Sequence, residues 1–149
     1  MNNTNEQSAS LRFGHVTEYD PSLHAARVSF PDRGTVSHWL PILTTNTLKN
    51  HDEVHLDPGE HVACLMAGNG SEMGVILGAF FDRKNTPPVH DQDKRAHTFD
   101  EGSQVIYDRA SHTITVKAEN ITLEGGKILF SGGTISLDGS VECPGYCRC

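Results

Sequence analysis

Residues 114–141 read ITVKAEN ITLEGGK ILFSGGT ISLDGSV, which is four consecutive units of seven residues. Each unit begins with isoleucine and carries a second apolar residue two positions later, giving the set Ile114, Val116, Ile121, Leu123, Ile128, Phe130, Ile135 and Leu137. Positions i and i+2 share one face of a strand, whereas the seam of a coiled coil needs i and i+3 or i+4. The repeat therefore predicts short strands separated by glycine-containing bends.

A single copy of this repeat leaves its apolar stripe uncovered and its strand edges unpaired. Three chains wound about a common axis would pair the edges and enclose the isoleucines in a triangular prism. A monomeric β-solenoid is the alternative, but its coils need more than seven residues, and four units are too few to stack. We therefore predict a trimeric, intertwined β-helix over residues 104–141, with the eight apolar positions as the trimer core.

The rest of the chain also reads as β-structure. Residues 1–10 are polar and predict a mobile tail. Residues 11–82 contain short strand-like runs separated by turn signals such as Asp57-Pro58-Gly59, a pattern typical of a small barrel or sandwich. Residues 83–103 are polar, contain adjacent prolines and lack periodicity, which predicts a linker. The predicted fold class is all-β.

Composition and net charge favour some classes of partner and argue against others. The chain has 149 residues, of which 36% are hydrophobic and 7% aromatic, so its core is small and association is expected. A net charge of −7 with scattered Lys and Arg argues against nucleic acid as a partner. No apolar run approaches the roughly 20 residues of a membrane span, and the first residues do not resemble a secretory signal.

Six further segments occur in a characteristic order: RFGHVTE (12–18), RVSF (27–30), HWLP (38–41), PGEHV (58–62), GVILGAFF (74–81) and DEGSQVIYD (100–108). Together with the seven-residue repeat, they resemble the baseplate assembly protein V family, the central spike of contractile phage tails and R-type pyocins. The resemblance spans roughly residues 11–141.

This resemblance implies an N-terminal OB-fold barrel, a trimeric β-helical needle, and a structural role without enzymatic activity. The spike would pierce the host outer membrane when the tail sheath contracts, so that membrane is contacted only transiently. The implied partners are two further copies of the chain and a baseplate hub protein, with a separate tip protein as a further candidate. The implied location is the virion tail baseplate, after assembly in the host cytoplasm. The resemblance covers both phage tails and pyocin-like particles and does not choose between them.

The end of the chain departs from the family. Its best-known members end in His-x-His, from which three chains supply six nitrogens to an apical iron. This chain has Cys147-Arg148-Cys149 instead, at the same i, i+2 spacing, and Cys143 lies nearby in a Cys-rich apex over residues 142–149. Thiolates bind iron and zinc, so one hypothesis is an apical metal site built from Cys147 and Cys149, with Cys143 as a further candidate ligand. Disulfides and free thiols are the alternatives.

Catalytic motifs are not evident in the sequence. The stretch His51-Asp52-Glu53-Val54-His55 has Asp where the zinc-protease pattern H-E-x-x-H needs Glu. The nine histidines are spread widely and predict no cluster with ligand spacing, and lone Cys64 is expected to be a buried thiol. Two other functions stay open: an OB-fold module that binds oligonucleotides or oligosaccharides, and a cell-wall-degrading tail enzyme.

Overall fold

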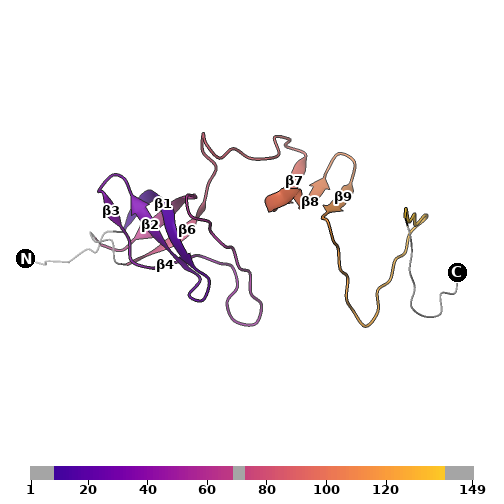
Figure 1. The fold of residues 1–149 in the computed structure, drawn as a ribbon, viewed down its shortest axis with the longest axis horizontal. Coiled ribbons are helices and arrows are strands. Elements are labelled where there is room, and N and C mark those ends of the chain that lie inside the picture. Colours follow the sequence, from indigo (N-terminus) through magenta and orange to yellow (C-terminus); the bar gives the residue numbers. More distant parts are fainter. Residues whose placement is uncertain (1–8, 69–72, 140–149) are drawn as a thin grey trace, which may run out of the picture. The chain divides into compact units, whose positions relative to one another are not determined.

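The structure, a computed structural model, describes residues 9–68 and 73–139. The chain divides into two compact units, Met1–Pro88 and Val89–Cys149. Within the described residues, regular structure consists of nine strands and one short 3-10 turn (Figure 1). The predicted all-β class is confirmed. No helix among these residues is long and apolar enough to cross a membrane.

The first unit is one curled antiparallel sheet in the order β3-β2-β1-β5-β6, with β4 also pairing with β2. Its strands are β1 (Ser10–Asp20), β2 (Ala25–Phe30), β3 (Thr35–Val36), β4 (Leu40–Pro41), β5 (His61–Met66) and β6 (Gly74–Ala79). Directly after β4, Ile42 forms a parallel bridge to Ile76 of β6, and the Leu43 amide donates to the Ile76 carbonyl at 2.8 Å. This contact joins the segment of β4, which pairs with β2, to the edge strand β6, so β1, β2, β4, β6 and β5 form a ring.

The long strand β1 makes the ring possible because it bends between two partners. Its first half, Ser10–His15, pairs with β5, and its second half, His15–Asp20, pairs with β2. A register shift between Val16 and Glu18 inserts one extra residue into β1, and such bulges increase bending and twist. At Gly14 an added Cβ would lie 2.6 Å from Val28 Cγ1 and closer still to the Ser29 carbonyl oxygen. Glycine is therefore required at this position, where the backbone of β1 lies close against residues of β2.

The core of the first unit follows from strand alternation. Val28 and Phe30 of β2 and Val62, Cys64 and Met66 of β5 are fully buried, as expected for residues that share one face of a strand. The complete buried cluster is Val16, Ala26, Val28, Phe30, Leu40, Ile42, Leu56, Val62, Cys64, Met66 and Ile76. The expected burial of Cys64 is confirmed, and this burial raises the pKa of its thiol to about 11.

The second unit begins with a three-stranded antiparallel meander in the order β7-β8-β9. Its elements are β7 (Lys94–Thr98), the 3-10 turn η1 (Asp100–Gly102), β8 (Gln104–Asp108) and β9 (Thr113–Lys117). The structure differs from the sequence prediction here, because β7 lies inside the segment 83–103 expected as a linker. Its sequence KRAHT has no apolar alternation, and backbone pairing with β8, from Lys94↔Asp108 to Thr98↔Gln104, forms the strand instead. An ion pair between Arg109 and Asp93 links the residues that flank this pairing.

The close approach of Gly14 in β1 to residues of β2 gives a test of the ring. Gly14→Ala should destabilise the folded chain by about 1–3 kcal/mol, because the added methyl group overlaps Val28 and the Ser29 carbonyl. Urea unfolding followed by circular dichroism measures this loss. Leu11→Ala is the matched control, since Leu11 lies on the same strand but is 56% exposed. Equal stabilities of Gly14→Ala and the parent protein would show that the predicted overlap is not real.

Candidate functional site

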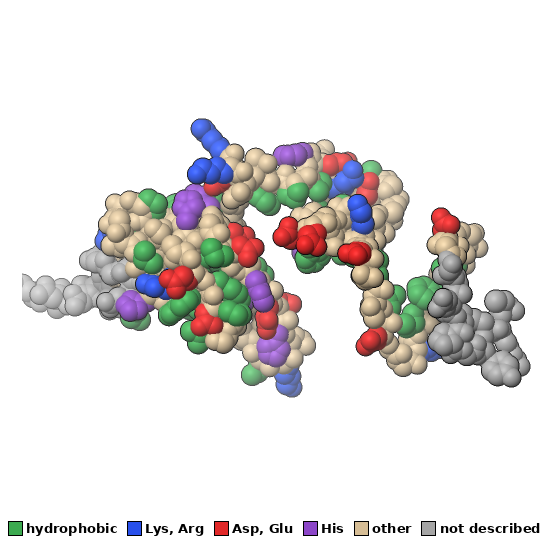
Figure 2. Space-filling view, in the orientation of Figure 1, with side chains coloured by type: hydrophobic (Ala, Val, Ile, Leu, Met, Phe, Trp, Pro, Cys, Tyr) green, Lys and Arg blue, Asp and Glu red, His purple; other side chains and the backbone are tan. Residues whose placement is uncertain are grey.

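The eight residues predicted as the trimer core are all exposed in the single chain. Their exposed fractions range from 46% for Ile128 to 73% for Leu137. Ile114 and Val116 lie on β9, whose five residues are all exposed, and residues 118–139 contain no strand. Figure 2 shows hydrophobic side chains on the surface of both units. Burial of these residues between three chains stays a prediction.

The predicted apical metal site cannot be placed in the fold. Cys143, Cys147 and Cys149 lie outside the described residues, so metal, disulfide and free thiol all stay open for them. Cys64 is not an additional ligand candidate, because it is fully buried in the core of the first unit. Its raised pKa keeps the thiol protonated at neutral pH.

A cluster that the sequence did not predict lies on the first unit, where His15, His61 and Asp82 meet. His15 of β1 and His61 of β5 are directly opposite each other in the strand register. Their rings stack with centroids 4.5 Å apart and an angle of 10° between planes. His61 Nδ1 lies 3.3 Å from Asp82 Oδ2. One possible ligand atom from each residue lies within 4.8 Å of the other two.

The prediction that no histidines cluster was therefore wrong. It rested on spacing along the chain, whereas these residues come from separate segments that strand pairing brings together. Each histidine lies in a strand-like segment, His15 in RFGHVTE and His61 in PGEHV. Pairing these two segments as neighbouring strands would have placed His15 opposite His61. Asp82 follows β6, and nothing in the sequence marked it as a partner.

Backbone hydrogen bonds hold the Asp82 carboxylate in place. Its Oδ1 accepts hydrogen bonds from the amides of Asn85, at 2.8 Å, and Lys84, at 2.7 Å. These amide donors lower the pKa of Asp82, and His61 contributes a smaller effect in the same direction. Oδ2 is thereby left facing His61. Nδ1 of His61 is buried and makes no well-aligned hydrogen bond, despite its distance of 3.3 Å from Oδ2.

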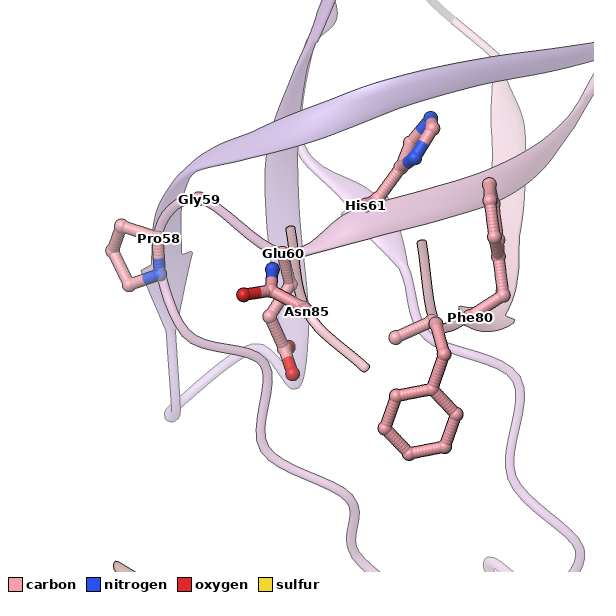
Figure 3. Close-up of a pocket in the computed structure, with 8 residues that line it drawn as sticks. Pro58, Gly59, Glu60, His61, Phe80 and Asn85 are labelled. Atoms are coloured by element: carbon pink, nitrogen blue, oxygen red, sulfur yellow. The ribbon is translucent and has the colours of Figure 1, made fainter. Parts of the chain in front are cut away.

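A pocket of about 600 Å³ lies beside this cluster and shares His61 with it (Figure 3). Figure 3 shows the His61 imidazole turned away from the turn at Pro58 and Gly59. His61 also packs against Phe80, with ring centroids 4.2 Å apart. The described residues that line the pocket are Pro58, Gly59, Glu60, His61, Ala79, Phe80, Phe81 and Asn85.

The pocket lining does not supply the chemistry of a glycosidase. That reaction uses two carboxyl groups flanking the scissile bond, and Glu60 is the one carboxylate among the described lining residues. Glu60 Oε2 already accepts a hydrogen bond from the Asp57 amide at 3.0 Å, which holds the turn before β5. The pocket therefore offers an apolar wall and a histidine rather than an acid–base pair.

No protein-family model and no curated protein sequence matches this chain.

The hydrogen bonds to Asp82 give a pH dependence of stability. A carboxyl group whose pKa is lower in the folded state stabilises the fold above its unfolded pKa of 3.8 and loses this effect as pH falls towards the folded pKa. Asp82→Asn should therefore be less stable than the parent protein at pH 7, with a smaller difference at pH 3. Urea unfolding at the two pH values measures both differences.

Asp32→Asn is the control for this experiment, because Asp32 is an exposed carboxylate in the same unit. It should change stability little at either pH. An equal loss for Asp82→Asn at pH 7 and pH 3 would contradict the assigned role of its charge.

Proposed function

We propose that this chain is the central spike of a contractile phage tail or tailocin baseplate, a homotrimer that pierces the host outer membrane during sheath contraction. One observation carries the proposal. The eight apolar residues at i and i+2 of four seven-residue units are all exposed in the single chain. Full burial of an exposed apolar side chain contributes about 1.5–3 kcal/mol, and covering these partly exposed residues with other chains would supply the remaining part of this stabilisation.

The glycines of the repeat support association of this kind. A Cβ added at Gly126, Gly132 or Gly133 would meet nothing within 4 Å, and none of the three has the positive φ that favours glycine. The single chain thus gives no steric reason for glycine at these bends. Close approach of neighbouring chains in a narrow prism supplies one, because glycine is the residue that permits close backbone contact.

The ring of the first unit supports the same assignment. Its strands follow the order β1-β2-β4-β6-β5 and close through Ile42 and Ile76. We infer an OB fold, which is a five-stranded Greek-key barrel. In the baseplate assembly protein V family that this chain resembles, such a barrel precedes the needle. The barrel would attach the spike to a baseplate hub protein, and the needle would contact the membrane.

Oligomeric state is the first test. Sedimentation equilibrium at micromolar concentration should give the mass of three 16.3 kDa chains. Ile121→Asp should shift the protein towards monomer, because it places a carboxylate in the apolar interior. The cost exceeds the roughly 2–5 kcal/mol of truncating a buried isoleucine to alanine.

Thr122→Asp is the matched control, since it adds the same charge at the next residue, on the opposite face of the strand. This variant should remain trimeric. A monomeric parent protein, or equal behaviour of the two variants, would contradict the predicted prism.

The second test concerns the particle. Contractile particles purified from cells that encode this chain should contain it together with sheath protein. An antibody against residues 11–82 should label the baseplate end of the tail in negative-stain micrographs. Consistent absence of the chain from sheath-containing particles would remove the spike assignment even if the protein is a trimer.

A further inference from the structure

We propose that His15, His61 and Asp82 form a site for a divalent transition metal ion of the zinc class. The site lies on the first unit, is built from residues other than the terminal cysteines, and does not depend on the proposed function. Its three donors come from three separate segments: β1, β5 and the stretch that follows β6.

The donor set defines the class of ion. Two imidazoles and one carboxylate suit zinc and its neighbours in the first transition row, whereas calcium and magnesium prefer sites made of oxygen donors. Three protein ligands also leave a fourth position for water. The side chains of His61 and Asp82 are 24% and 23% exposed, so the site is sheltered yet reachable from solvent.

The distances are close to those of a loaded site. A tetrahedral ion about 2.1 Å from each donor sets neighbouring donors about 3.4 Å apart. His61 Nδ1 and Asp82 Oδ2 are already 3.3 Å apart, and all three donors lie within 4.8 Å of one another. Loading requires the His15 ring to rotate out of its parallel stack on His61, so that the lone pairs of both rings converge. Side-chain torsions permit this without a change in the strand register.

Two features of the surroundings point to a ligand at this place. Backbone amides of Lys84 and Asn85 occupy Oδ1 of Asp82 and orient Oδ2 towards the histidines, which is how outer hydrogen bonds position metal-binding carboxylates. Buried polar atoms in folded proteins nearly always have a partner, and an ion is one explanation for an exception. His61 Nδ1 is only partly satisfied, because the Asp82 carboxylate lies 3.3 Å away without forming a well-aligned hydrogen bond.

A proton is the competing occupant. Protonated His61 could pair with Asp82 without any metal, and the stacked histidines would then be a local packing feature. The metal site and the ion pair differ in the number of zinc ions that the chain should bind. A metal site binds one ion per chain through all three residues, whereas a simple ion pair binds none.

Zinc retention by the full chain distinguishes these outcomes. The background carries Cys143→Ser, Cys147→Ser and Cys149→Ser, which removes the terminal thiols as competing ligands. After incubation with zinc and dialysis at neutral pH, elemental analysis should find one zinc per chain. His61→Gln and Asp82→Asn should each weaken zinc binding by about tenfold or more. His38→Gln is the control, since His38 is an exposed histidine of the same unit outside the cluster, and it should bind like the parent.

A second measurement does not depend on whether the variants fold. In the background protein, zinc should shift the imidazole NMR signals of His15 and His61 and leave those of His38 unchanged. Failure of the background protein to retain zinc would overturn the proposal. Zinc retention that is unchanged in both folded variants, or zinc-dependent shifts confined to other histidines, would overturn it as well.

Discussion

A strand unit of seven residues has one apolar face and two edges of unsatisfied backbone groups, and repeating it along one chain covers neither. This constraint applies to the seven-residue repeat of residues 114–141. The side chains from Ile114 to Leu137 that define the repeat are exposed, and residues 118–139 form no strand within a single chain. Neighbouring chains would supply both missing elements, because their strands pair the edges and their isoleucines fill the interior. The low aromatic content of the sequence is consistent with a needle whose core is shared.

The first unit meets the same constraint within one chain. Its ring closes through Ile42 and Ile76, the bulge of β1 between Val16 and Glu18 increases its bending, and the buried cluster forms its core. The first unit therefore buries its core within one chain, whereas the apolar residues of the repeat are exposed in the single chain. The proposed spike would use this division, with the first unit held by a baseplate and the repeat forming a stiff, narrow needle.

The sequence predicted the all-β class and the burial of Cys64 correctly, because both follow from short-range alternation and turn signals. It missed β7, since the pairing of KRAHT with β8 depends on backbone hydrogen bonds that leave no apolar pattern. It also missed the cluster of His15, His61 and Asp82, because proximity there arises from strand register rather than from spacing along the chain. The trimer core and the role of the terminal cysteines stay predictions, since each depends on neighbouring chains or on residues outside the described part.

Hydrogen–deuterium exchange across residues 121–137 of the full-length protein in solution tests the central claim most directly. If three chains wind into a prism, the backbone amides of this segment are hydrogen-bonded between chains and should exchange as slowly as those of the barrel core around Val28 and Val62. Exchange at the rate of an unstructured peptide, with the barrel amides still protected, would contradict the account.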